Sequence, residues 1–252
     1  MRRLWIPALG LMALMGAFSS PARAVDEVFQ KTYPLAPEGI LELQNVNGSV
    51  QITGWDRDAV EVRAVKRTQR DAAELDRVQI SVSPTMGRVA IETRYPADEG
   101  VEVFVEYTIR VPRRAQLREV NTVNGTVRVS GVDSSGNLRS VNGNVELLDS
   151  SGAFSARTTN GDLRLELRNL DSAGPFSAET VNGSILLALG PGAGASLEVR
   201  TMNGDFRSDL PVSVLGASGS REFRGRLGRG GNTLALHTVN GTIRIVALTP
   251  TA

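Results

Sequence analysis

Apolar and polar residues alternate on both sides of an Asn-Gly pair that recurs along the chain. Four residues before each asparagine the position is apolar or small, and three and five residues after it the positions are apolar, except at Ser208. Polar residues such as Gln51, Arg128 and Arg244 stand between the apolar ones. Alternation of this kind is typical of a β-strand with one buried face. Each copy therefore predicts a strand, a corner and a second strand.

The copies return at a nearly constant interval. From the second copy onward the asparagines follow one another after 18, 18, 22, 21 and 37 residues. A fixed period near 20 residues is the signature of a repeat architecture. The last interval is about two units long, and we interpret it as a decayed copy near "REFRGRLGRGG". The predicted repeat corners are Asn47 and Gly48, Asn124 and Gly125, Asn142 and Gly143, Asn160 and Gly161, Asn182 and Gly183, Asn203 and Gly204, and Asn240 and Gly241.

Two all-β architectures fit this pattern. Glycine adopts positive φ without steric cost and asparagine tolerates it, so each pair predicts a tight reversal or corner. In a repetitive β-solenoid with about 18–22 residues per coil, equivalent positions stack, and stacked asparagines bond to one another. In an antiparallel β-meander each pair is a hairpin turn, but Arg157 would then oppose Arg164, an unfavourable like-charge pair. We favour the solenoid, and parallel pairing of Val127 with Val145 would decide for it.

The first 24 residues have the layout of a secretory signal peptide. Arg2 and Arg3 form a basic start, Leu4 to Phe18 are mostly apolar, and "ARA" at 22–24 supplies a small-x-small cleavage pattern. The apolar run of about 15 residues is shorter than the roughly 20 that a spanning helix needs. We therefore expect a signal peptide at 1–24, export to the periplasm or cell surface, and no transmembrane segment after cleavage.

The remaining chain divides by the regularity of its pattern. Residues 25–40 form an N-terminal lead-in, and residues 41–252 form a single β-repeat domain. Its first part, 41–116, is irregular and includes one short, charged helical patch at 69–77, whereas 117–252 holds the regular repeats.

Composition narrows the classes of function. Three of the 28 basic residues lie in the predicted signal, which leaves 25 against 27 acidic residues and a net charge of −2. This balance gives no reason to expect a nucleic-acid partner. The chain has no cysteine, so it lacks thiol catalysis and thiolate metal sites. Its single histidine, His237, excludes histidine-cluster zinc sites and falls at a polar, outward position.

Candidate chemistry is sparse. Asp162 and Asp205 hold the same repeat position and could form an acid–base pair, but the other copies carry Ser, Thr or Asn there. That pattern indicates a small polar residue and not a required acid, so we expect no catalytic, cofactor or metal site. Four arginines within nine residues form either a solvated loop or a contact for an anionic partner, such as an acidic glycan or phospholipid head groups. These arginines are Arg221, Arg224, Arg226 and Arg229.

Several stretches together resemble a known bacterial family. They are "NVNGSVQITGWDRDAVEVRAVKR", "VFVEYTIRVPRRAQL", the repeated "TVNG" phrase and "GRGGNTLALHTVNGTIRI". The family consists of domains of unknown function with β-strand repeats that are labelled putative adhesins, and the resemblance covers about residues 38–247. It implies an exported or envelope-associated protein with a repetitive β-fold and no enzymatic activity. Some relatives are linked to envelope stress signalling.

Three hypotheses of function follow. The first is a non-enzymatic, adhesin-like structural or interaction module of the cell envelope that binds an unknown envelope protein or glycan. The second is a sensory or regulatory partner in envelope stress. The third is a polysaccharide-active β-helix enzyme.

Overall fold

The computed structural model describes residues 25–97, 100–170, 174–217 and 221–249, so the predicted signal peptide lies outside the described residues. Within them the fold is all-β apart from one short helix, α1 (Ala73–Arg77). The strands are β1 (Val25–Pro34), β2 (Ile40–Gln44), β3 (Val50–Trp55), β4 (Ala59–Thr68), β5 (Gln79–Thr85), β6 (Arg88–Arg94), β7 (Val103–Pro112), β8 (Gln116–Asn121), β9 (Val127–Ser130), β10 (Asp133–Arg139), β11 (Val145–Asn160), β12 (Leu163–Asn169), β13 (Phe176–Asn182), β14 (Ile185–Leu189), β15 (Ala195–Asn203), β16 (Phe206–Ser208), β17 (Val212–Ala217), β18 (Glu222–Leu227), β19 (Thr233–Asn240) and β20 (Ile243–Ala247).

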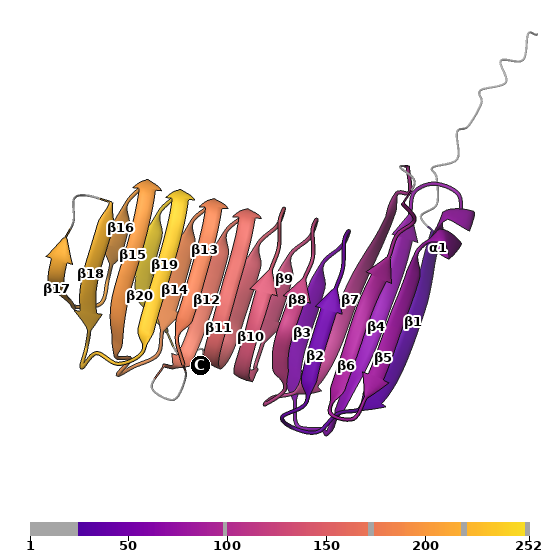
Figure 1. Cartoon of the computed structure of the whole chain (residues 1–252), viewed down its shortest axis with the longest axis horizontal. Helices are drawn as coiled ribbons and strands as arrows, with labels where there is room; N and C mark the ends of the chain where they lie inside the picture. The colour runs from indigo at the N-terminus through magenta and orange to yellow at the C-terminus, as the bar shows by residue number, and fades with distance from the viewer. Residues whose placement is uncertain (1–24, 98–99, 171–173, 218–220, 250–252) are drawn as a thin grey trace, which may run out of the picture.

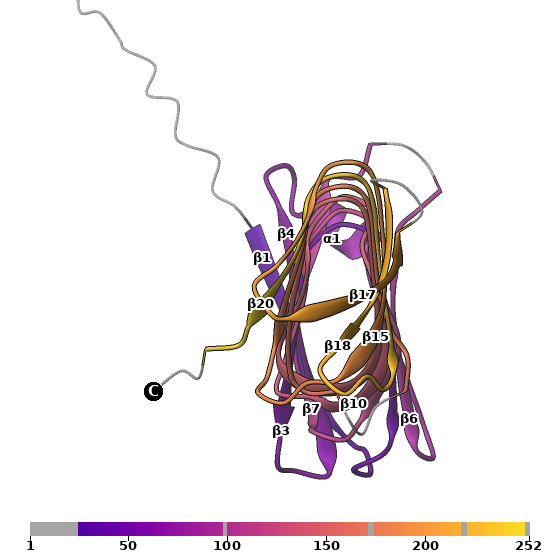
Figure 2. The same cartoon turned by 90° about the vertical axis from the view of Figure 1, so that its left-hand side faces the viewer.

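These strands wind into a flattened solenoid with two broad faces (Figures 1 and 2). One face, here named the β8 face, contains in spatial order β5, β6, β2, β8, β10, the second half of β11, β13, β19, β15, β18 and β17. The other, the β9 face, contains β1, β4, β7, β3, β9, the first half of β11, β12, β14, β20 and β16.

Equivalent positions of successive copies pair in parallel. Val127 pairs in parallel with Val145, and Val145 pairs in parallel with Leu163. The two strands that flank a corner lie on opposite faces and pair with their counterparts in neighbouring coils, as β8 and β9 do. The expected β-solenoid-like repeat is therefore confirmed, and the antiparallel meander is wrong for the repeat array.

The core is the narrow space between the two faces. In strands such as β7 and β9 every second residue is buried, and the alternating apolar positions of the sequence supply these residues. Leu43, Val120 and Leu138 from the β8 face and Val127 and Val145 from the β9 face are all at most 1% exposed. Burying each such side chain contributes about 1.5–3 kcal/mol, so every coil adds its own layer of stabilisation.

The coils do not stack in chain order at either end. The first coil, β2 and β3, lies between β6–β7 and β8–β9, although β6 and β7 follow it in sequence. The last coil, β19 and β20, likewise lies between β13–β14 and β15–β16. Both coils are therefore held on two sides by neighbours.

Antiparallel strands close both ends of the array. At one end β4 pairs with β7 and β1, and β5 pairs with β6. At the other end β18 pairs with β15 and β17, and β17 crosses the open end of the solenoid (Figure 2). The segment interpreted as a decayed copy is thus an antiparallel closing strand, and that interpretation is wrong.

Residues 25–40, which the sequence analysis treated as an N-terminal lead-in, contribute strand β1. This strand pairs with β4 along its whole length.

Candidate functional site

The seven Asn-Gly corners lie along one edge of the solenoid, where their side chains form a continuous ladder. Each asparagine donates its Nδ2 to the Oδ1 of the next, at 2.7–2.9 Å, in the spatial order Asn203, Asn240, Asn182, Asn160, Asn142, Asn124 and Asn47. The structure therefore uses these residues to join coils, and their regular recurrence reflects the stacking.

The glycines of the corners are needed mainly because the coils stack so closely. A Cβ on Gly161 would lie 2.2 Å from the carbonyl oxygen of Gly143, and a Cβ on Gly183 would lie 1.9 Å from that of Gly161. Neither residue has a positive φ, and among the described residues Asp149 is the only non-glycine that does. Gly48, by contrast, has a φ of 126°, so positive φ is used at that corner glycine, whereas no corner asparagine has a positive φ.

A second ladder runs beneath the first, and the sequence analysis missed it. The residue two before the asparagine is Thr or Ser in six copies, and its hydroxyl donates to the corner glycine carbonyl of a neighbouring coil. The six bonds measure 2.7–3.3 Å and come from Thr122, Ser140, Thr158, Thr180, Thr201 and Thr238. These side chains are almost completely buried. A small hydroxyl residue in six of seven copies was the signal that could have identified this ladder.

The two aspartates weighed as an acid–base pair are separated. Asp162 accepts a hydrogen bond from the backbone N–H of Ser184 at 2.8 Å, and Asp205 pairs with Arg207 at 3.3 Å. Three coil steps lie between the two aspartates, which is roughly 14 Å at the usual strand spacing. Among the described residues, no three His, Cys, Asp or Glu side chains gather closely enough to hold a metal ion.

His237 lies on β19 between Glu179 and Arg200 of the flanking strands. Its Nε2 is buried and has no hydrogen-bond partner within the described part of the chain. His237 thus lies at an outward position of the alternation, as the sequence pattern predicted, and its imidazole packs partly into the surface.

The four clustered arginines lie at the end of the solenoid that β17 and β18 close. Arg224 and Arg226 are alternate, exposed residues of β18, and Arg221 and Arg229 flank that strand. Arg224 pairs with Glu222 at 3.1 Å, and Glu222 also contacts Arg200 at 3.1 Å. The structure thus gathers the four arginines on and beside one closing strand, with their charge only partly neutralised.

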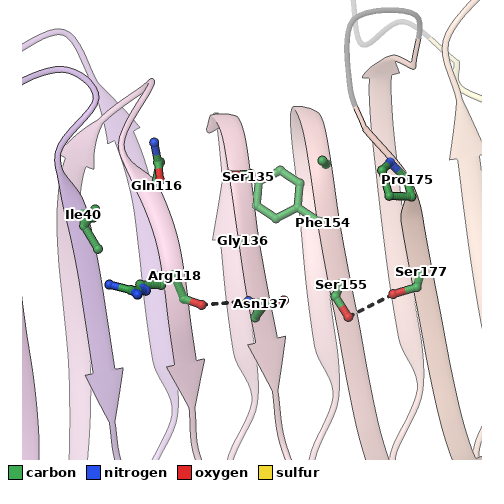
Figure 3. Close-up of a pocket in the computed structure, with 11 residues that line it drawn as sticks. Ile40, Gln116, Arg118, Ser135, Gly136, Asn137, Phe154, Ser155, Pro175 and Ser177 are labelled. Atoms are coloured by element: carbon green, nitrogen blue, oxygen red, sulfur yellow. Dashed lines mark hydrogen bonds between the residues drawn. The ribbon is translucent and has the colours of Figure 1, made fainter. Parts of the chain in front are cut away.

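A groove lies on the β8 face (Figure 3). Its volume is about 650 Å³, and it crosses five neighbouring strands from β2 to β13. Four strand spacings correspond to roughly 19 Å along the solenoid. The groove therefore suits an extended ligand that runs across the strands.

Small side chains create the groove. Ser135, Gly136 and Ala153 lie on its floor, with Ser155 and Ser177 bonded to each other at 2.9 Å (Figure 3). The Phe154 ring lies beneath Gly136 and is only 1% exposed, since a Cβ on that glycine would lie 3.0 Å from the ring. The floor consequently offers hydroxyl groups and backbone but no exposed aromatic ring.

Longer side chains form the walls, and a bulge in β8 positions one of them. The register between β8 and β10 shifts near Arg118, and the Nδ2 of Asn137 donates to the Arg118 carbonyl at 2.9 Å (Figure 3). Arg118 and Gln116 are exposed, with the Arg118 guanidinium 3.5 Å from the Glu42 carboxylate. Pro175 stands at the opposite end. A bulge beside a depression is a frequent device for re-aiming a side chain, here Arg118.

The described residues contain no helix with the length and apolarity that crossing a membrane requires.

A comparison with curated proteins finds no match. Among solved structures, a putative cell adhesion protein from Clostridium sporogenes is 9% identical, with a TM-score of 0.48 over 88% of this chain and 100% of that chain. A putative adhesin from Bacteroides fragilis is 11% identical, with a TM-score of 0.42 over 88% of this chain and 97% of that chain.

The family profile described as "Toastrack DUF4097" matches residues 37–246. This match covers most of the chain and includes all seven Asn-Gly corners, so the resemblance found in the sequence is confirmed. The chain belongs to the Toastrack DUF4097 family.

Proposed function

We propose that this protein is an exported, non-enzymatic interaction module of the cell envelope, adhesin-like in that it presents a surface to a ligand. Its repeat of about 18–22 residues per coil serves to build that surface. The observation that carries the proposal is the groove on the β8 face, with its floor of small side chains and its polar walls.

The chemistry of the groove favours a hydroxyl-rich, extended chain such as an envelope glycan. Ser135, Ser155 and Ser177 offer hydroxyls that both donate and accept, while Gln116 and Arg118 add an amide and a guanidinium. An extended chain can lie across the five strands, because consecutive coils repeat the same small positions.

The experiment is a glycan-array measurement with the purified chain, using neutral and acidic envelope polysaccharides. Ser135→Trp fills the floor of the groove, and Gln116→Ala together with Arg118→Ala removes polar groups from one wall. Thr108→Trp places the same bulk at an exposed position on the β9 face and is the matched control.

We expect the groove variants to lose at least tenfold in glycan affinity and the control to bind like the wild type. Binding that survives in both groove variants would refute the groove as the ligand site. If the array shows no glycan binding while a membrane signalling protein is captured through the same groove, the envelope-stress partner function replaces the adhesin-like one.

A further inference from the structure

A second cavity lies at the end of the solenoid that β17 and β18 close. Its volume is about 300 Å³, and apolar side chains and glycines line it throughout. Leu189 ends β14 and Pro191 follows in the β14–β15 connection, while Leu210 lies between β16 and β17. Leu227 ends β18, and Leu248 lies near the end of the described chain. No hydroxyl, amide or charged side chain lines this cavity, so its chemistry differs from that of the groove.

Exposed apolar side chains also lie on β17, one of the two strands that close this end of the solenoid. Val214 and Leu215 of β17 are 62% and 66% exposed. They are adjacent in an edge strand that carries no charged residue between Val212 and Ala217. Natural edge strands usually carry charge or proline that prevents association. Exposed apolar residues on an uncharged edge strand indicate a surface that contacts another apolar surface, such as a protein or a membrane.

Two arginines lie close to this apolar end. Arg229 directly follows Gly228, which lines the cavity, and Arg226 precedes the cavity residue Leu227. Neither Arg226 nor Arg229 forms an ion pair with any residue that the structure describes. The nearby acid Asp209 is already paired with Arg244 at 2.8 Å. The Arg226 side chain lies against Gly230, since a Cβ on that glycine would lie 3.2 Å from Nε of Arg226. Both arginines therefore lie at the turn that follows the cavity residue Gly228 and are available to an anion.

We propose that this end of the protein binds an anionic membrane phospholipid, with part of one acyl chain in the apolar cavity and the phosphate held by Arg226 and Arg229. An arginine guanidinium suits phosphate because it donates two parallel hydrogen bonds. Val214 and Leu215 contact the surrounding lipid surface. The cavity volume equals about ten groups of the size of water, at roughly 30 Å³ each, which is room for part of a single chain. An acidic glycan would leave the cavity and the two exposed side chains without a function, so the lipid fits more of the observations.

The proposal is tested by vesicle co-sedimentation and by binding of a monomeric lysolipid. The probes are vesicles of phosphatidylcholine with and without phosphatidylglycerol, and lysophosphatidylglycerol beside lysophosphatidylcholine. The variants are Arg226→Ala with Arg229→Ala, and Leu210→Trp to fill the cavity. Arg63→Ala, an exposed arginine of β4 at the other end of the solenoid, is the matched control. All variants share the same N-terminus, so any contribution of residues 1–24 cancels in the comparison.

We expect the wild type and Arg63→Ala to prefer phosphatidylglycerol vesicles, and the double arginine variant to lose at least tenfold in that binding. Leu210→Trp should weaken lysophosphatidylglycerol binding, whereas the groove variant Ser135→Trp should leave it unchanged.

Equal binding to both vesicle types, or a double arginine variant that binds like the wild type, would overturn the proposal. Competition by an acidic polysaccharide with no lysolipid binding would assign the arginines to a glycan. Lysolipid binding that appears only after removal of residues 250–252 would also overturn it, because the chain's own C-terminus would then fill the cavity.

Discussion

Asn240 donates its side-chain amide to Asn182 at 2.7 Å, although 58 residues separate the two in the chain. On its other side Asn240 accepts from Asn203 at 2.8 Å. The last coil in sequence is therefore an interior coil in space, and the core of the array depends on it.

Replacing a core residue of the last coil should cost as much stability as replacing one in the middle of the array. Ile243→Ala removes a fully buried side chain, and we expect a loss of about 2–5 kcal/mol in the free energy of unfolding, similar to Leu163→Ala. Urea denaturation followed by circular dichroism measures both. Val246→Ala, at an outward position of β20, is the control. A loss below about 1 kcal/mol for Ile243→Ala would mean that the last coil frays like a free end.

A methyl group at a corner glycine should prevent close stacking of two coils. In Gly161→Ala the new Cβ would lie 2.2 Å from the Gly143 carbonyl oxygen, and we expect a loss of about 1–3 kcal/mol or failure to fold. Gly174→Ala meets only an ordinary contact at 3.5 Å and should be nearly neutral. Thermal denaturation of the two variants compares them directly, and equal melting temperatures would contradict the steric explanation.

The asparagine ladder should respond to the position of the substitution within it. Asn142→Ala removes two amide–amide hydrogen bonds, whereas Asn203→Ala removes one, because Asn203 is the last member of the ladder. At about 0.5–1.5 kcal/mol per bond, the interior variant should lose about twice as much stability as the terminal one. Urea titrations of both proteins provide the values. The ladder would have no energetic role if neither variant differed from the wild type.

The hydroxyl ladder is buried and should therefore be more sensitive. Thr180→Val keeps the shape of the side chain but removes the donor to the Gly161 carbonyl, which lies 3.0 Å away in a nearly inaccessible position. We expect a loss of about 1–3 kcal/mol, the usual cost of a buried unsatisfied group. Thr108→Val at an exposed site of β7 is the matched control. Chemical denaturation should separate the two, and a neutral Thr180→Val would indicate that another donor reaches the carbonyl.

Alkaline pH should destabilise the end of the solenoid near the first corner. Burial raises the pKa of Tyr95 to about 12, while its hydroxyl donates to the Asn47 carbonyl at 3.3 Å. The pKa of Tyr107 is also raised by burial. Because the folded state keeps these phenols protonated above the unfolded pKa near 10, stability should be complete below pH 10 and fall as the pH rises toward 12. Urea midpoints measured from pH 8 to pH 12 test this, and Tyr95→Phe should show a smaller decline; an identical decline would assign the effect to other groups.

Much of the repeat could be predicted because the pattern of buried and exposed positions is set within each copy. Val127 and Val145 occupy the same place in the alternation, and the like charges of Arg157 and Arg164 argued against a hairpin. Both considerations pointed to parallel stacking, which the structure shows. The exposed asparagines were visible as a column of identical residues, whereas the threonines beneath them were overlooked because serine and asparagine also occur in that column.

The order of the coils could not be predicted in the same way. Asn203 and Asn240 have equivalent surroundings in the sequence, so nothing local says which of them follows Asn182 in space. That choice depends on β18, whose Phe223 packs against Phe206 with ring centroids 4.9 Å apart and closes the array beyond β16. The groove was equally hidden, since it arises from Ser135, Ala153 and Ser177, which come from different strands and look unremarkable in isolation.

The antiparallel strands at both ends also fix the length of the molecule. Coils can be added only where space and sequence agree in order, between Asn124 and Asn182, because elsewhere an extra unit would separate a coil from the partners that hold it on two sides. Duplicating the 18 residues from Gly143 to Asn160 would lengthen the protein by about 4.8 Å and leave both ends as they are. The groove crosses these central coils, whereas the apolar cavity lies at the closed end, so an added coil would lengthen the groove and leave the cavity unchanged.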